Sequence, residues 1–348
     1  MKLVITIDTE EDNWLPFNRH ISTRNAREIG RLHDLFVSEG VIPTYLVTWP
    51  MANDDYLVDT LADERLKGRC EIGAHCHPWT TPPVNEAHHP PNSMLCNLER
   101  ELVAEKLHRL HNLLSQRFNA PPRTFRAGRW GFGVHVADVL RSLGYRVDTS
   151  VTAYTDWSSQ HGPDYSLVGP QAYRFAPPNL YEASPSGTLI ELPASVGFLR
   201  GEFGRRARVE KFLRTRPWRR LRLIGLLKRL SLHQRATLSP ECATTSEMTS
   251  LIDAMQMRGY EYANLFFHSP TLVPGLTPFL TTTRDRDNFL HSLRAVLRHA
   301  KRRGLTSIPA SAVTIAGGAQ VAEPEAPAAQ PSSASPSPLH RPRSAAGR

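Results

Sequence analysis

Short apolar segments alternate with amphipathic segments through the first half of the chain, and this alternation constrains the fold more than any other feature. Residues 2–8 (KLVITID), 42–49 (IPTYLVTW) and 70–77 (CEIGAHCH) are predicted strands, because each is short and apolar. The helical spacing of apolar residues at 25–39 and 55–67 predicts helices between them. Strands that alternate with helices favour a parallel sheet, either open or closed into a barrel.

The alternation continues beyond residue 90 and then becomes less regular. Six or seven β/α units fit the part of the chain that is expected to fold, residues 1–316, which we predict to be one domain. The further predictions are helices at about 94–117, 135–144, 246–258 and 287–303, and strands at 123–128, 145–151, 188–195 and 260–268.

The positive charge of the chain is concentrated in one segment. The 348 residues carry a net charge of +9, and residues 200–235 hold thirteen Lys/Arg against two acids, a local charge of +11. The remainder of the chain therefore sums to −2. We interpret 200–235 as a basic helical insertion, whose partner is either an anionic ligand or a membrane surface that it contacts peripherally. No nucleic-acid recognition motif accompanies the charge, which disfavours nucleic acid; the alternative is a solvated lid helix.

Composition also indicates a disordered end and a reduced environment. Residues 317–348 are rich in Ala, Pro and Ser, and such a tail is expected to be disordered because it has little apolar surface to bury. The four cysteines have neither paired zinc spacing nor the density of a disulfide scaffold. No signal-peptide or membrane-spanning pattern is present, so a cytoplasmic location is expected.

Two histidines one residue apart end the third predicted strand. Side chains alternate faces along a strand, so His75 and His77 lie on one face and Cys76 on the other. Asp8 and Glu10 follow the same rule at the end of the first strand, and the carboxyl ends of parallel strands collect functional groups. Two histidines and one carboxylate are a common catalytic zinc set. The alternative is that the histidines are polar residues at a sheet rim.

Other predicted strands also end in ionisable residues. Arg126 ends the fourth strand, with Arg129 close behind it, and His268 ends the strand at 260–268. Taken alone, Arg126 would be a surface ion-pair partner and His268 a loop residue. Asp148 on the fifth strand is expected to cap a turn.

The order of these motifs resembles a known family. Asp8-Thr9-Glu10, His75-Cys76-His77, Phe125-Arg126-Ala127-Gly128 and Leu265-Phe266-Phe267-His268 resemble the ordered motifs of the polysaccharide deacetylases, carbohydrate esterase family 4. The segments HCHPWTTPP and RAGRWGFG resemble its WalW-like branch, which is associated with lipopolysaccharide biosynthesis. The resemblance covers residues 1–315 and implies an irregular (β/α)7-type barrel.

The resemblance implies a role for each matching residue. Asp8 would be the general base, Arg126 would orient it, and His268 would be the general acid. Thr9 stands where the family has a second aspartate, so Glu10 would be the ligand that joins His75 and His77, with Glu11 and Asp12 as alternatives. Arg129 is the alternative to Arg126. The ion would be divalent, Zn²⁺ by the donor set.

The reaction that the resemblance implies is the removal of an acetyl group from an N-acetylated sugar of a cell-envelope polysaccharide or lipopolysaccharide precursor. The acetylated saccharide substrate would be lipid-linked or anionic. Two alternatives stay open: another metal-dependent amide hydrolase, and a catalytically inactive glycan-binding relative. The second is suggested by Thr9 and Trp79, which stand at motif positions where the family has a ligand.

Overall fold

The computed structural model describes residues 1–12, 14–17, 20–215, 218, 224–225 and 234–315. They all belong to one compact unit, Met1–Gly318. The tail at 317–348 and much of the basic segment, including Arg219, Arg220 and Arg222, lie outside the described residues, so the expectations for them stay predictions.

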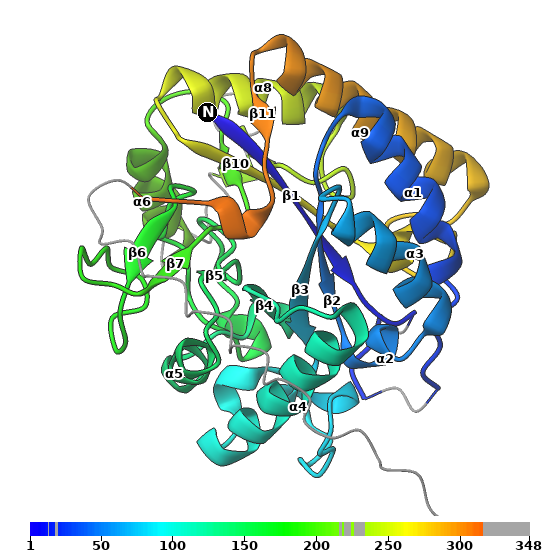
Figure 1. Ribbon diagram of the computed structural model, residues 1–348. Helices are drawn as coiled ribbons and strands as arrows, with labels where there is room; N and C mark the ends of the chain where they lie inside the picture. Colours follow the sequence, from blue (N-terminus) through cyan, green and yellow to red (C-terminus); the bar gives the residue numbers. More distant parts are fainter. Residues whose placement is uncertain (13, 18–19, 216–217, 219–223, 226–233, 316–348) are drawn as a thin grey trace, which may run out of the picture. The chain divides into compact units, whose positions relative to one another are not determined.

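A parallel sheet forms the centre of this unit (Figure 1). Its strands are β1 (Lys2–Thr9), β2 (Thr44–Val47), β3 (Glu71–Cys76), β4 (Thr124–Ala127), β5 (Val147–Asp148), β7 (Leu189–Glu191) and β10 (Tyr262–His268). Their spatial order is β10-β1-β2-β3-β4-β5-β7, and all neighbours in this series are parallel. Antiparallel β6 (Tyr173–Phe175) extends the β7 edge, and β11 (Thr306–Ser307) pairs with the start of β1.

Backbone hydrogen bonds connect the two ends of the series. The N–H of Ser195, just after β7, donates to the carbonyl of Asn264 on β10 at 3.2 Å. Leu238 bridges the same gap, because its N–H donates to Ser195 and its carbonyl accepts from Phe266. The sheet therefore curls into an irregular barrel, and the predicted α/β fold of the (β/α)7 type is confirmed.

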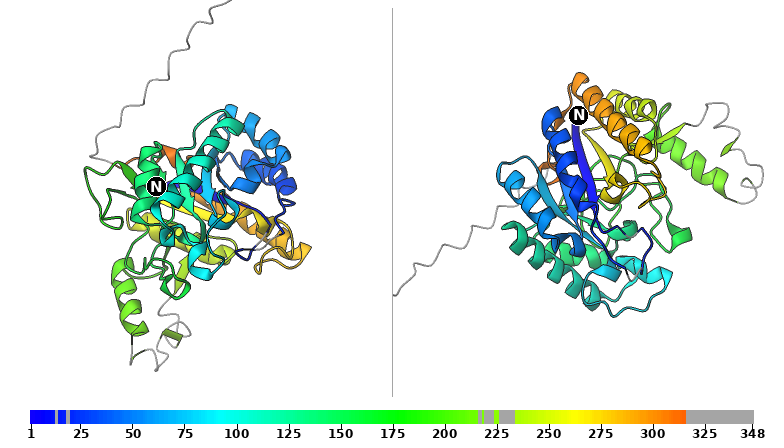
Figure 2. Two further views of the ribbon diagram at one scale, coloured as in Figure 1. Left: turned by 90° about the horizontal axis from the view of Figure 1, so that it is seen from below. Right: turned by 90° about the vertical axis from the view of Figure 1, so that its right-hand side faces the viewer.

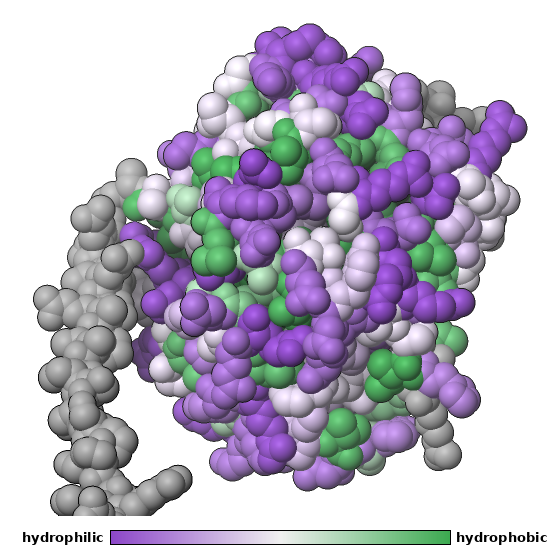
Figure 3. Space-filling model, turned by 45° about the vertical axis from the view of Figure 1, so that its right-hand side comes forward, coloured by the Kyte–Doolittle hydropathy of each residue, from purple (hydrophilic) through white to green (hydrophobic). Residues whose placement is uncertain are grey.

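Helices cover the outside of the sheet (Figure 1). They are α1 (Ala26–Glu39), α2 (Trp49–Ala52), α3 (Asp55–Leu66), α4 (Arg100–Phe118), α5 (Val134–Ser142), α6 (Phe203–Arg214), α8 (Thr245–Met257) and α9 (Thr283–Arg302). Helix α1 buries Ile29, Leu32 and Phe36, which recur at helical spacing, and leaves its other face polar. Figure 3 shows hydrophilic residues dominating one such outer face, with hydrophobic ones interspersed.

Two predicted helix boundaries are wrong, and local hydrogen bonding explains both. Helix α4 begins at Arg100 rather than Met94, because the Cys96 N–H donates to the Gly131 carbonyl instead of entering a helix. Helix α9 begins at Thr283 rather than Asp287, because Thr282 and Asp285 form a capping box four residues earlier than expected.

The sequence pattern also missed several short elements. Strands β8 (Val196–Phe198) and β9 (Arg235–Thr237) form a separate antiparallel pair after β7. Helix α6 lies between them in the chain and projects from the barrel (Figure 2). Among the described residues, no helix is both long and apolar enough to span a bilayer.

Candidate metal centre and active site

Glu10, His75 and His77 lie together at the carboxyl end of the sheet. One oxygen of Glu10, Oε2, lies 3.3 Å from His75 Nε2 and 3.2 Å from His77 Nε2. One ligand atom from each residue lies within 4.8 Å of the others, and all three residues are buried. Strand β3 presents the two imidazoles on one face, as the alternation of side chains predicts, and Glu10 comes from the end of β1.

The second nitrogen of each imidazole has a fixed partner. His75 Nδ1 lies 2.9 Å from the Arg126 carbonyl oxygen, and His77 Nδ1 lies 2.8 Å from Glu11 Oε1. Donation through Nδ1 leaves both Nε2 atoms available as ligands, and in protein metal sites such a hydrogen bond fixes the orientation of the ligating imidazole. Two neutral imidazoles and a carboxylate therefore fit a divalent ion with an open position for water.

The ionisable groups of this cluster shift one another's pKa values. Burial raises the pKa of Glu10, but hydrogen bonding to His75 and His77 outweighs it and holds this pKa below its usual range. Burial likewise lowers the pKa of His77, but Glu11 and Glu10 outweigh it and raise this pKa to about 10, so a cation that binds here displaces the proton from this ring and leaves it neutral. Glu10 is thus held as a carboxylate, the form that binds a cation.

Asp8 and Arg126 form a buried ion pair beside the cluster. Arg126 Nη1 donates to Asp8 Oδ1 at 2.5 Å, and Arg126 has no exposed surface. The remaining guanidinium donors reach Thr6 Oγ1 at 2.7 Å and the Thr149 carbonyl at 2.9 Å. Since every branch of the guanidinium is held, its charge-assisted hydrogen bond fixes the position of the Asp8 side chain.

His268 faces Asp8 from the end of β10. Its Nε2 lies 3.6 Å from Asp8 Oδ2, and its Nδ1 lies 2.9 Å from Glu241 Oε2. Glu241 also accepts the His268 backbone N–H at 3.0 Å. Burial lowers the pKa of His268, but Glu241, Glu10 and Asp8 outweigh it and raise this pKa to about 10. An imidazolium oriented by a carboxylate can donate a proton near neutral pH.

The turn after β4 brings backbone against the metal ligands. A Cβ atom on Gly128 would lie 2.4 Å from His77 Cδ2 and 2.7 Å from the Cys76 carbonyl oxygen, so glycine is needed there. The next two residues, Arg129 and Trp130, have φ of 54° and 62°, in the left-handed region. Such conformations cost on the order of 1–3 kcal/mol each and are concentrated at functional sites.

Substituting Gly128 with alanine is expected to weaken metal binding without removing a ligand. The added methyl would displace His77, and overpacking of this kind typically costs about 1–3 kcal/mol. Calorimetric titration with Zn²⁺ would show the lower affinity. Gly259→Ala is a suitable control, because no atom lies within 4 Å of its Cβ position, although its φ of 75° adds backbone strain of its own. An unchanged metal affinity in Gly128→Ala would contradict the packing argument.

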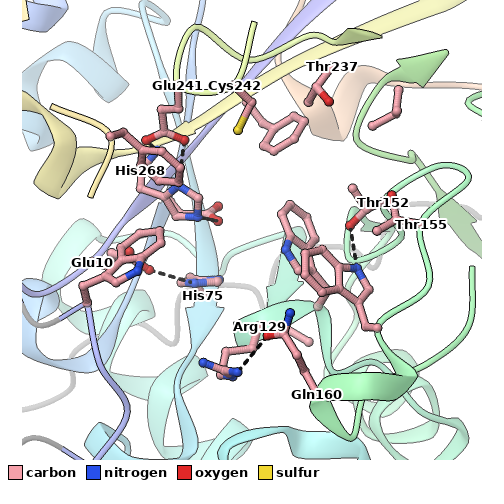
Figure 4. A pocket seen from close by; sticks show the side chains of 18 of the residues that line it. Glu10, His75, Arg129, Thr152, Thr155, Gln160, Thr237, Glu241, Cys242 and His268 are labelled. Atoms are coloured by element: carbon pink, nitrogen blue, oxygen red, sulfur yellow. Dashed lines mark hydrogen bonds and ion pairs between the residues drawn. The ribbon is translucent and has the colours of Figure 1, made fainter. Parts of the chain in front are cut away.

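A pocket of about 560 Å³ opens above these residues (Figure 4). Asp8, Glu10, His75, His77 and His268 all line it. Its walls are strongly aromatic, and the lining includes Trp14, Trp79, Trp130, Trp157, Phe266 and Phe279. A pocket of this volume with aromatic faces suits a small ligand that presents flat apolar faces.

Two of the alternative carboxylates have other roles. Glu11 contacts His77 Nδ1 and does not belong to the ligand cluster. Asp12 accepts hydrogen bonds from the backbone of Arg24 and Asn25 and so anchors the approach to α1. Asp148 accepts from the Ser150 N–H at 3.0 Å, which is the turn-capping role expected from the sequence.

The sequence interpretation missed two groups that the fold brings in. Glu241 follows β9 in a loop and carries no motif, so nothing in the sequence pairs it with His268. Glu191 on β7 lies in register with Asp148 on β5, and both are fully buried. Burial raises the pKa of Asp148 to about 6, although hydrogen bonds with Glu191 and Ser150 lower it. Burial and repulsion by Asp148 raise the pKa of Glu191, so this pair can share a proton.

Solved structures share this architecture, although no protein-family model and no curated protein matches the chain. A Parabacteroides distasonis structure assigned as a glycoside hydrolase/deacetylase has a TM-score of 0.55 at 10% identity, covering 89% of this chain and 69% of the other. This chain has the barrel fold of that structure.

Two further solved structures are named as a deacetylase and an esterase. A Mycobacterium smegmatis protein assigned as a polysaccharide deacetylase has a TM-score of 0.47 at 15% identity, covering 88% of this chain and 92% of the other. A family 4 carbohydrate esterase from Streptomyces lividans in complex with acetate has a TM-score of 0.41 at 10% identity, covering 88% and 91%. The fold that the sequence resemblance implied is confirmed, whereas the WalW-like branch stays a prediction.

Proposed function

We propose that this protein is a metal-dependent deacetylase that hydrolyses the acetamido group of an acetylated saccharide. The observation that carries the proposal is that three groups line one pocket. They are the cluster of two histidines and one glutamate, Asp8 paired with Arg126, and His268 paired with Glu241. The fold similarity to carbohydrate-active hydrolases supports it.

Each residue has one task in the proposed reaction. A divalent ion held by Glu10, His75 and His77, proposed to be Zn²⁺, would polarise the acetyl carbonyl and lower the pKa of a water molecule. Asp8 accepts a proton from the attacking water, and Arg126 keeps it ionised and aimed. His268 donates a proton to the departing amine, while Glu241 holds its ring in place. Acetate and a free amino sugar are the products.

The departure from the family pattern at Thr9 does not remove the metal ligand. The Thr9 hydroxyl donates to the Ile7 carbonyl at 3.1 Å, and Glu10 supplies the carboxylate one residue later. His77 likewise replaces the family's second histidine, and Trp79 stacks on its ring at 4.3 Å. These contacts favour an active enzyme over an inactive glycan-binding relative.

An acetate-release screen tests the proposal. Full-length protein loaded with Zn²⁺ should release acetate from N-acetylated saccharides, nucleotide-linked sugars or lipid-linked sugars, and His75→Ala should not. Release from a simple N-acetylated amide that lacks a sugar, with none from any saccharide, would instead support a general amide hydrolase. No release from any compound by protein with bound metal would contradict the catalytic proposal.

We also propose that α6 contacts an anionic membrane surface, which would bring a lipid-linked substrate to the pocket. One face of this helix is exposed over successive turns and combines Arg205 and Arg208 with Val209 and Phe212. Val209 is 48% exposed and Phe212 55%, and Trp218 packs beside Phe212 at 5.6 Å. Basic and aromatic side chains on one exposed face are typical of interfacial helices.

Charge reversal on α6 should weaken binding to acidic lipid. Arg205→Glu with Arg208→Glu is expected to lower the affinity for phosphatidylglycerol vesicles, measured by co-sedimentation, by about 30-fold or more, since each basic residue near the surface contributes about 1 kcal/mol. Binding should also fall as salt rises. The control is Lys301→Glu with Arg302→Glu at the end of α9, which changes the net charge equally. Equal binding by wild type to phosphatidylcholine and phosphatidylglycerol vesicles at low salt would refute the idea.

A further inference from the structure

Arg129 differs from the other charged side chains that line the pocket. Among the described residues, the charged lining groups other than the metal cluster are Asp8, Arg129, Arg235, Glu241 and the imidazolium of His268. Asp8 pairs with Arg126, Glu241 with His268, and Arg235 lies 3.7 Å from Glu210. Arg129 forms no ion pair within the described part of the chain, and its one hydrogen bond goes to the neutral Gln160 Oε1 at 3.1 Å (Figure 4).

The guanidinium of Arg129 is also partly shielded from water, and not all of its N–H groups have a hydrogen-bond partner among the described residues. Its Nε is buried without a hydrogen-bond partner among the described residues. Burial lowers the pKa of Arg129, which shows that the charged form is taken partly out of water. An arginine nevertheless stays protonated, because its ordinary pKa is so high. A desolvated cation with no counter-charge is unfavourable until a ligand supplies a negative group.

The backbone places Arg129 close to the reacting centre. Gly128 packs directly against the His77 ring, and the next Cα along a trans chain lies about 3.8 Å away. The left-handed φ of Arg129 and Trp130 turns the chain sharply at this point. Trp130 and Trp157 are stacked at 6.4 Å and lie in the same part of the pocket, where they offer aromatic surface to a sugar ring.

We propose that Arg129 binds a negatively charged substituent of the sugar, a carboxylate or a phosphate, so that the substrate class is an anionic acetylated saccharide. This inference rests on the proposed function for the identity of the sugar, but the anion-binding role of Arg129 does not require turnover. A planar guanidinium with several free N–H donors matches either oxyanion, and a carboxylate can accept two of them at once.

Equilibrium binding to the full-length, zinc-loaded protein tests this role. The probes are N-acetylglucosamine 6-phosphate and N-acetylgalactosaminuronic acid, each compared by calorimetry with its neutral parent sugar. Wild type should bind at least one charged sugar about tenfold or more tightly than its parent, the ratio that one charge-assisted hydrogen bond supports. The two charged probes distinguish a phosphate from a carboxylate ligand.

Substitutions then assign the preference to a residue. Arg129→Gln should remove it, whereas Arg235→Gln should keep it, because Arg235 already has Glu210 as an acidic neighbour. If Arg129→Gln does not fold, Arg129→Asn serves instead, since asparagine tolerates the left-handed backbone well. Equal affinity of wild type for charged and neutral sugars would overturn the inference, as would an undiminished preference in the Arg129 variants.

The same samples separate this inference from the proposed function. If an Arg129-dependent charge preference occurs but no sugar releases acetate, the anion site stands and the deacetylase proposal fails. If acetate is released equally from charged and neutral sugars that bind equally, the deacetylase proposal stands and the anion site fails.

Discussion

Replacing any one of Glu10, His75 or His77 by alanine is expected to abolish tight binding of a divalent ion. The three ligand atoms converge within 4.8 Å in a buried site, so the loss of one leaves two ligands and a cavity. Loss of a group that only hydrogen-bonds to a metal ligand typically costs about 10–100-fold in metal affinity, so the loss of a ligand itself should exceed about 100-fold. Calorimetry and elemental analysis of protein equilibrated with Zn²⁺ measure this directly.

Matched variants show whether the loss is specific. His108→Ala removes an exposed imidazole on α4 whose Nδ1 contacts its own helix, and it should leave metal content unchanged. Glu11→Gln removes the partner of His77 Nδ1 but no ligand, and it should lower affinity by about 10–100-fold. Wild-type affinity and stoichiometry in both His75→Ala and His77→Ala would rule out the proposed metal centre.

The fold was predictable because local patterns and strand topology agree. Apolar strands such as Lys2–Thr9 alternate with helices such as Ala26–Glu39, and parallel connection follows from that order. The boundary errors arise where side chains compete with the helix, as in the capping box of Thr282 and Asp285. Very short strands such as Val196–Phe198 carry too few residues for a period-two pattern to be detected.

Some residues of the site could be predicted from local sequence patterns, and others depend on contacts between distant parts of the chain. The arrangement of His75 and His77 follows from strand periodicity alone, and Asp8 and Glu10 follow from the same rule on β1. Glu241 was not predictable, because a loop 27 residues before His268 brings it to the ring, and no pattern encodes that contact. The partners of the Arg129 guanidinium likewise depend on which neighbours the fold supplies. From the sequence, Arg129 was predicted only as an alternative to Arg126.

Loss of the acid or the base should reduce turnover strongly while leaving the metal in place. Asp8→Asn and His268→Ala are each expected to lower kcat by about 10²–10⁴-fold on a substrate confirmed by the acetate-release screen. Neither residue belongs to the ligand cluster, so metal content should stay at the wild-type level. KM should change little in His268→Ala, because proton donation to the amine matters in the transition state.

Folding controls are needed for Asp8→Asn. The substitution leaves Arg126 buried without its counter-charge, and breaking a buried pair typically costs about 3–5 kcal/mol of stability. Assays should therefore run well below the measured Tm of the variant. Asp148→Asn is the matched control, because it changes a buried carboxyl that does not line the pocket, on β5, the strand beside β4 and Arg126.

The pH dependence of turnover tests the acid more sharply. His268 must be protonated to donate, so activity should fall on the basic limb as pH rises through the pKa of His268, which Glu241 and the neighbouring carboxylates raise to about 10. Glu241→Gln removes the negative charge that favours the imidazolium, so this pKa should fall and the basic limb should move to lower pH. A bound cation acts on His268 in both proteins, so the shift is read as the difference between variant and wild type. A basic limb that does not move in Glu241→Gln, or that persists in His268→Ala, would show that another group donates the proton.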